Sequence, residues 1–254
     1  MKTMNKLLTG FVMLTLIMGM AFAGSAFAAG NEVKLIKSTL YLGSFGSVGF
    51  SGDIEVENIS PTKTVTVHYT TDNTNWYSTN ASYVGPTSGS YEQWNFTVST
   101  SWLNNIHPEL DGLSFIKFYI EYNVSGSTYY DNNGGSDYYN EPFISGPGST
   151  ILSARNVLSS FGEVLSSTNF RGSVLVKNLA PTKTVKILYT TNNWATTQTG
   201  FASYTGAANN FGSAEHWNYS FTVPSGSTVK FKIEYTVSGS TYVDDNYGAT
   251  YTAT

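Results

Sequence analysis

Between residues 118 and 131, hydrophobic and polar side chains alternate in a pattern typical of a half-buried β-strand and hairpin. The hydrophobic positions of the first strand are Phe118, Ile120, Tyr122 and Val124. Ser125-Gly126 predicts a tight turn, after which residues 128–131 return. A hairpin loop with an even number of residues places Tyr130 on the same outward face as Tyr119. The two side chains are then at most about one diagonal cross-strand position apart. The pattern therefore predicts two neighbouring outward tyrosines, which form a flat apolar surface in water.

The same pattern returns at residues 231–246, as part of a repeat that covers almost the whole chain. Residues 50–58 return 120 positions later as 170–178, whereas the hairpin returns after 113 positions. The extra residues of the first copy include Trp102, which has no counterpart. In the second copy, Lys232 and Val243 stand in place of Tyr119 and Tyr130. The scaffold is repeated but the tyrosine pair is not, so we expect the first copy to bind the more strongly.

Each copy consists of short alternating segments separated by turn signals, and no stretch has convincing helical periodicity. This organisation favours an all-β chain of two tandem antiparallel β-sandwiches. We expect one domain over residues 29–140, a short proline-containing linker over 141–150, and a second domain over 151–254. Such a linker predicts that the domains are loosely but not freely arranged.

Residues 1–28 have the organisation of a secretory signal peptide. Lys2 and Lys6 precede an apolar run, and Ala26-Phe27-Ala28 is a small-x-small cleavage site. The apolar run is short and contains two glycines, which argues against a transmembrane anchor. We therefore expect a secreted, extracellular protein.

The composition narrows the possible functions further. The chain has no cysteine, which excludes disulfides and thiol chemistry, and its net charge is −4 with only 12% charged residues. These values argue against nucleic acid or an anionic membrane as a partner. Aromatic residues make up 15% of the chain, 18 of them tyrosine. An extracellular all-β binding domain has this composition.

No residue pattern indicates catalysis or a metal site. The histidines, His68, His107 and His216, do not recur between the copies. Three acidic positions do recur, as Glu92/Glu215, Glu121/Glu234 and Asp131/Asp244. Solvation of the sheet and capping of turns explain them without a glycosidase acid–base pair. The Asn-rich loop at 131–135 is read as a turn in preference to a calcium site, with hydrogen bonding to a ligand as a second role.

The tryptophans fall into two groups that recur between the copies. Trp94 and Trp217 lead into Phe-Thr-Val strands and are predicted to lie in the core. Trp76 and Trp194 lie in polar loops, where neighbouring residues cannot easily bury an indole, so we expect them to be exposed.

These motifs, taken in order, resemble the family 21 carbohydrate-binding modules. The resemblance rests on Tyr91–Phe96 (Tyr-Glu-x-Trp-x-Phe), on Phe118–Asn133 with its Tyr-Tyr-Asp-Asn-Asn ending, and on the closing Tyr138. It implies an immunoglobulin-like β-sandwich that binds α-glucan and has no catalytic activity or cofactor. The main sugar site of the family would match Trp76, Tyr119 and Tyr130, and the last two are the pair that strand parity places together.

The resemblance also implies further ligand-binding residues. Asn133 and Asn246 match an asparagine near the sugar, and Trp194 is what the second copy retains of the main site. A second aromatic site would match Tyr83 and Tyr91 in the first copy and Tyr204 in the second. Its third aromatic falls on Pro61 and Pro181. Asp137 and Thr250 depart from the asparagine that usually precedes the closing tyrosine.

The function predicted from the sequence is a secreted, non-catalytic protein that binds starch, glycogen or maltooligosaccharides and serves separate secreted amylases. The alternative is an extracellular adhesin or matrix protein whose sandwich binds another glycan or a protein.

Overall fold

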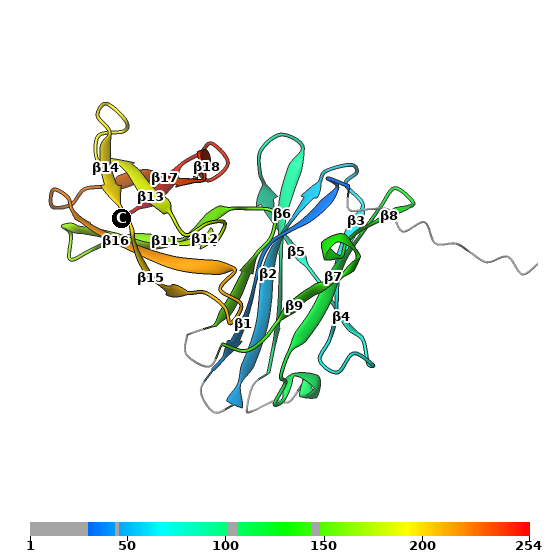
Figure 1. Ribbon diagram of the computed structural model, residues 1–254. Helices are drawn as coiled ribbons and strands as arrows, with labels where there is room; N and C mark the ends of the chain where they lie inside the picture. Colours follow the sequence, from blue (N-terminus) through cyan, green and yellow to red (C-terminus); the bar gives the residue numbers. More distant parts are fainter. Residues whose placement is uncertain (1–29, 44–45, 101–105, 144–147) are drawn as a thin grey trace, which may run out of the picture.

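The structure, a computed structural model, describes residues 30–43, 46–100, 106–143 and 148–254. The predicted signal peptide and Trp102 therefore lie outside the described residues. Two β-sandwiches follow each other along the chain, the first coloured blue to green and the second yellow-green to red in Figure 1. Every strand pair is antiparallel, and the predicted all-β tandem architecture is confirmed.

The first module contains two sheets. One has the order β10-β1-β2-β6-β5, and the other has the order β4-β3-β7-β8, with β9 also paired to β7. The strands are β1 (Val33–Leu42), β2 (Val48–Glu57), β3 (Lys63–Thr70), β4 (Tyr77–Asn80), β5 (Ser82–Pro86), β6 (Tyr91–Ser99), β7 (Ile116–Val124), β8 (Ser127–Asp131), β9 (Tyr138–Asn140) and β10 (Ser149–Leu152). Two short 3₁₀ helices, η2 (Pro108–Leu110) and η3 (Asn133–Gly135), lie in loops.

The second module repeats this plan with sheets ordered β11-β12-β16-β15 and β14-β13-β17-β18, with β19 also paired to β17. Its strands are β11 (Val157–Leu165), β12 (Asn169–Lys177), β13 (Lys183–Thr190), β14 (Gln198–Phe201), β15 (Ser203–Ala207), β16 (Ala214–Thr222), β17 (Val229–Val237), β18 (Ser240–Asp244) and β19 (Tyr251–Ala253). None of the described residues belongs to a helix that is long and apolar enough to cross a membrane.

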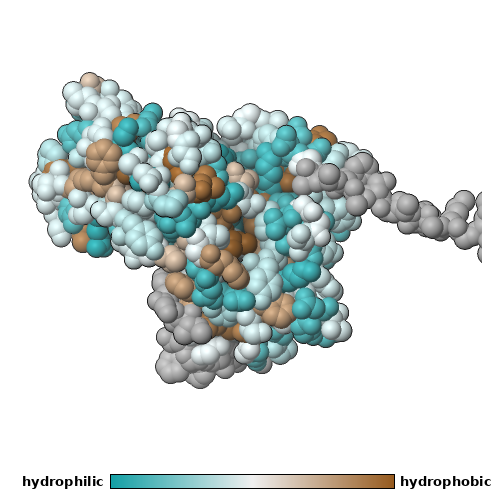
Figure 2. Space-filling view, viewed as in Figure 1, coloured by the Kyte–Doolittle hydropathy of each residue, from teal (hydrophilic) through white to brown (hydrophobic). Residues whose placement is uncertain are grey.

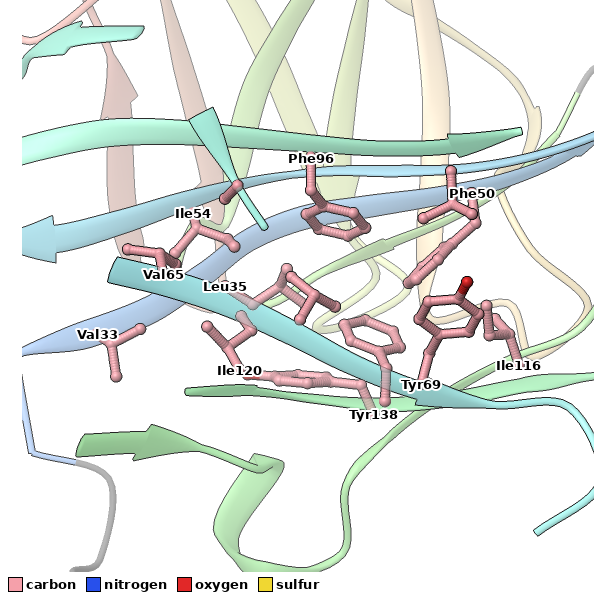
Figure 3. Close-up of a cluster of buried hydrophobic side chains, with 14 of the residues drawn as sticks. Val33, Leu35, Phe50, Ile54, Val65, Tyr69, Phe96, Ile116, Ile120 and Tyr138 are labelled. Carbon is pink, nitrogen blue, oxygen red and sulfur yellow. The ribbon is translucent and has the colours of Figure 1, made fainter. Parts of the chain in front are cut away.

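One buried phenylalanine organises each core. Phe50 is fully buried, and its ring packs edge-on against Tyr69, Phe96 and Phe118 at centroid distances of 5.9, 4.9 and 5.0 Å. Figure 3 shows Phe50 and Phe96 facing Tyr69 across the space between the sheets. Phe170 takes the same place in the second module and contacts Tyr189, Tyr219 and Phe231. The repeated inward residues thus build the same aromatic core twice.

The recurring Asp131 and Asp244 have a structural role that reaches across the sandwich. A β-bulge follows Leu35 in β1, and the backbone N–H of Leu35 donates to Asp131 Oδ2 at 2.6 Å. The hydroxyl of Tyr138 donates to the same carboxylate at 2.9 Å. In the second module, a bulge follows Ser159, whose N–H donates to Asp244, as does the Tyr251 hydroxyl. Because a bulge leaves backbone groups without a partner in the strand ladder, the carboxylate satisfies one of them and fixes the closing strand.

The segment interpreted from the sequence as a linker contributes to both modules at its described end. Strand β10 pairs with β1, from Lys37↔Leu152 to Leu40↔Ser149, and so extends the first sandwich. The N–H of Thr150 donates to the Ala208 carbonyl, and the Asn209 side chain donates to the Thr150 carbonyl. One strand is therefore hydrogen-bonded to both modules.

An ionic contact adds to this junction. The Arg155 guanidinium donates to Glu55 in the first module at 2.9 Å and lies over the Tyr247 ring in the second at 4.8 Å. Hydrophobic residues on the face in Figure 2 form small separate patches, several of them near where the modules meet. Such a face offers no broad apolar area of the kind that large protein interfaces use.

Candidate carbohydrate-binding surface

The β3–β4 loop presents Trp76, and Asp72 organises this loop. The Asp72 carboxylate accepts hydrogen bonds from the backbone N–H groups of Thr74 and Asn75 at 2.7 and 2.8 Å, and from the Asn75 side chain. These bonds favour the ionised carboxylate and lower the pKa of Asp72 to about 2. Trp76 remains 43% exposed, which confirms the predicted exposure of its indole.

Trp76, Tyr119 and Tyr130 form one continuous aromatic surface, the platform. The β7–β8 hairpin turns at Ser125-Gly126, both with positive φ, and pairs Glu121 with Tyr130. Tyr119 and Tyr130 therefore lie on one face, as the alternation predicts, with ring centroids 6.2 Å apart. The Trp76 and Tyr119 centroids are 5.4 Å apart. Strand alternation thus predicted the Tyr119–Tyr130 pair, the family resemblance added Trp76, and the structure brings all three rings together.

His68 and Glu121 support this platform from within the same sheet. His68 lies directly opposite Tyr119 in the β3–β7 pairing, and the two rings stack 4.8 Å apart at 14°. Nε2 of His68 lies 3.5 Å from Glu121, whose other oxygen accepts a hydrogen bond from Asn123 at 2.6 Å. Burial and the nearby Glu121 charge raise the pKa of both Tyr119 and Tyr130, so their hydroxyls stay protonated at neutral pH. A protonated hydroxyl can both donate to and accept from a sugar hydroxyl.

The loop after β8 ends the platform on one side. Asn132 accepts from the N–H of Gly135, and the Asn133 side chain donates to the Asp137 carbonyl at 3.2 Å. These bonds confirm the predicted turn. Asn133 is exposed with φ of 52° and stands next to the β8 strand of the platform. Asn246 repeats the arrangement, donating to the Thr250 carbonyl at 3.3 Å.

The corresponding surface of the second module has a different form. Leu188, Trp194, Thr197, Lys232 and Thr250 line a pocket of about 180 Å³. Lys232 and Leu188 face each other in the strand pairing, as Tyr119 and His68 do in the first module. Trp194 is half-buried, less exposed than predicted, because this pocket partly encloses its indole. The second module therefore has one ring in a pocket where the first has an open platform of three rings.

The residues of the implied second site do not all meet. Tyr83 is 54% exposed, and its ring lies 5.9 Å from Trp94 at 75°, beside a cleft of about 380 Å³ that Pro61 also lines. Tyr91 lies elsewhere, under the Lys34 ammonium at 4.5 Å, because alternation along β6 turns it away from the face of Trp94. In the second module, Tyr204 contacts Trp217 in the same T-shaped way at 6.0 Å.

Trp94 and Trp217 are less buried than the sequence predicts. Each is only partly buried and packs against the edge of the core. The Trp94 indole N–H points to Glu92 at 3.4 Å, and Glu92 also accepts from Lys63 at 2.7 Å. The recurrence of Lys, Glu and Trp together was the available signal, since Lys183, Glu215 and Trp217 make the same contacts.

His107 pairs with Glu109, and burial lowers the pKa of His216. The described residues contain no group of three His, Cys, Asp or Glu side chains that could hold a metal ion.

A two-sheet sandwich with exposed aromatic rings on one sheet face is the architecture of a carbohydrate-binding module. The chain belongs to the carbohydrate/starch-binding module family 21, whose model matches residues 29–140 and 153–254. Both repeats are therefore copies of this module.

The chain is similar to several known proteins. Glucoamylase 1 of Rhizopus oryzae is 44% identical over 94 residues, a match that spans 35% of this chain and only 14% of the enzyme. The starch-binding domain of Rhizopus oryzae glucoamylase, solved with β-cyclodextrin and maltoheptaose, is 38% identical with a TM-score of 0.31 and covers 43% of this chain and 92% of its own. The carbohydrate-binding module of the muscle glycogen-targeting subunit of protein phosphatase-1 is 25% identical with a TM-score of 0.33, covering 39% and 74%.

Proposed function

We propose that the chain is an exported, non-catalytic protein that binds α-glucans mainly through the platform of its first module. The observation that carries this proposal is the set of ring contacts joining Trp76, Tyr119 and Tyr130 on one exposed sheet face. The axial C–H groups of a glucose ring pack on such π-faces while the equatorial hydroxyls stay hydrated. By analogy with base stacking, each stack contributes about 1–3 kcal/mol.

Export is proposed from the sequence alone, on the charged, apolar and small-residue order of residues 1–28. Binding outside the cell would concentrate starch or glycogen for separate secreted amylases. A few stacks with little buried area predict weak binding at one site, roughly high micromolar to millimolar.

The surroundings of the recurring carboxylates support a non-catalytic role. Asp131 and Asp244 are held by backbone and tyrosine donors, and Glu92 and Glu215 by lysines. Glu121 has partners on the sheet face, and Glu234 pairs with Lys186 at 3.1 Å. A glycosidase acid needs a carboxyl group kept protonated beside the scissile bond. Burial does raise the pKa of Asp244, but its oxygens already accept from the Ser159 N–H and the Tyr251 hydroxyl, which ties this carboxyl group to the fold.

Affinity electrophoresis of the mature chain in gels containing soluble starch, glycogen or no polysaccharide tests the proposal. We expect retardation in both polysaccharide gels and no release of reducing sugar. A pull-down on insoluble starch beside cellulose distinguishes an α-glucan binder from an adhesin for another glycan. Equal mobility in all gels would refute α-glucan binding.

A further inference from the structure

The pocket of the second module combines an aromatic ring with an unpaired cation. Trp194 and Lys232 both line it, and among the described residues no carboxylate lies within ion-pair distance of Lys232. Its volume of about 180 Å³ is below the roughly 300 Å³ at which pockets begin to enclose whole drug-sized ligands. The pocket is therefore suited to a ligand of about the size of one sugar unit.

The charge around this pocket is opposite to that around the platform. The formal charges can be counted over equivalent segments of the two modules. In the first module these are β3, β4, β7, β8 and loops 71–76 and 132–137. In the second they are β13, β14, β17, β18 and loops 191–197 and 245–250. In the first module these segments carry one outward cation, Lys117, and the anions Asp72, Glu121 and Asp137, with the inward Asp131 and Lys63, which pairs with Glu92, set aside. In the second they carry Lys186, Lys230 and Lys232 against Glu234 and Asp245, with the corresponding Asp244 and Lys183, which pairs with Glu215, set aside. The formal charge of the outer face is therefore 1 − 3 = −2 in the first module and 3 − 2 = +1 in the second.

Individual substitutions explain this reversal. Lys117 is neutralised by Asp137 at 3.2 Å, whereas Thr250 stands in place of Asp137 and the Lys230 ammonium donates to the uncharged Asn193 at 2.6 Å. Asn192 replaces Asp72 as the side chain that orders the tryptophan loop, accepting from the Thr196 N–H. Of these three outward lysines, Lys186 is the one with an anionic partner among the described residues, Glu234.

The backbone also holds Trp194 in a demanding conformation. Trp194 has φ of 70°, in the left-handed region that bulky residues rarely adopt, and its N–H donates to Thr190 Oγ1 at 3.1 Å. This conformation places the indole on the wall of the pocket that Lys232 also lines. A sugar ring stacked on Trp194 would thus have an ammonium group within the same pocket.

We infer that the second module binds an α-glucan or related polysaccharide unit that carries an anionic group, a phosphate monoester or a carboxylate. This inference rests on the proposed function, since it assumes that a sugar stacks on Trp194. The Lys232 ammonium is the donor to the anion, and Lys230 adds positive potential beside it. Each ammonium acts on a phosphate or carboxylate as a point charge with up to three hydrogen-bond donors.

The test uses the full chain with the platform disabled by Tyr119→Ala and Tyr130→Ala. Dissociation constants are measured by affinity electrophoresis in phosphate-bearing amylopectin, in the same polymer after phosphatase treatment, and in polygalacturonate. We expect phosphatase treatment to weaken binding about 3- to 10-fold, because an exposed charged hydrogen bond is partly screened. Lys232→Gln should abolish that difference, whereas Lys37→Gln, with the same loss of charge in the first module, should retain it.

Polygalacturonate distinguishes the two anions: retention there that Lys232→Gln removes would assign the site to a carboxylate. The inference would be overturned if phosphatase treatment left the affinity unchanged and polygalacturonate did not bind. It would also be overturned if Lys232→Gln reduced the affinity for neutral and phosphorylated polymer by the same factor. If the unmodified chain binds starch while the platform-disabled chain binds none of the polymers, the inference fails and the proposed function stands. If the unmodified chain binds no glucan, the proposed function itself fails.

Discussion

The two modules share the residues that point into the sandwich and differ in those that point out of one sheet. Phe50 and Phe170 organise matching cores, and Asp131 and Asp244 join matching strands. On the outer face, however, Tyr119 and Tyr130 correspond to Lys232 and Val243. Because successive side chains of a strand point to opposite faces, the binding surface can change completely while the core stays the same.

The shared scaffold is where we expect the largest effect of a single substitution. Asp131→Ala leaves the Leu35 N–H and the Tyr138 hydroxyl without their buried acceptor. Loss of a charged acceptor with two such donors should lower the free energy of unfolding by about 3 kcal/mol. Asp244→Ala should cause a similar loss in the second module. Urea denaturation of the full chain measures both; a stability unchanged by either substitution would refute the role assigned to these carboxylates.

Loss of the platform should reduce binding without reducing stability. Tyr119→Ala with Tyr130→Ala removes two stacking faces, which at about 1 kcal/mol or more each weakens binding about 30-fold or more. The melting temperature should stay nearly constant, since neither ring lies in the core cluster. Titration calorimetry with maltoheptaose, beside a thermal melt, measures both quantities. A large fall in the melting temperature would show that the pair is structural.

Transfer of the platform to the second module should increase binding. Lys232→Tyr with Val243→Tyr restores the missing pair on β17 and β18, where Val243 is 48% exposed and lies opposite Glu234 as Tyr130 lies opposite Glu121. In the chain whose first platform is disabled, this change should strengthen maltoheptaose binding about 10-fold. The matched control is Lys232→Ala with Val243→Ala, which removes the charge without adding rings. Equal affinity in both variants would show that outward tyrosines alone do not create a site.

Asp72 should have the smallest effect, through the position of Trp76. The pKa of the Asp72 carboxyl group is lowered in the folded chain to about 2, below its ordinary value of 3.8. Its contribution to the stability of the loop that carries Trp76 is therefore complete above about pH 4 and is lost as the pH falls through about 2. From pH 4 to 7, this group should leave maltoheptaose affinity unchanged. Asp72→Ala should weaken binding about threefold by loosening the loop that orders Trp76. Fluorescence titrations at pH 4 and 7 test both statements, and a marked fall in affinity from pH 7 to pH 4 in the parent but not in Asp72→Ala would contradict this role.

The structural features that could be predicted from the sequence are those that depend on residues close together in the chain. Alternation and the Ser125-Gly126 turn placed Tyr119 and Tyr130 on one face, because a short hairpin fixes its own register. The contact between His68 and Tyr119 depends on pairing between strands 51 residues apart, and that between Asp131 and Leu35 spans 96 residues. Hydrophobic periodicity carries no information on such distant pairing. The addition of β10 to the first sandwich was not predicted for the same reason. The separation of Tyr91 from Tyr83 follows instead from alternation along β6, which matching residues to a family motif does not take into account.

The difference between the modules is tested most directly by two matched substitutions in the full chain, Trp76→Ala and Trp194→Ala. Each removes the tryptophan of one β3–β4-type loop and leaves the other module intact. The affinity for maltoheptaose, measured by calorimetry, should fall about 10-fold for Trp76→Ala and change less than about twofold for Trp194→Ala, because only Trp76 belongs to a platform of three rings. Equal losses, or a larger loss for Trp194→Ala, would contradict the assignment of α-glucan binding mainly to the first module.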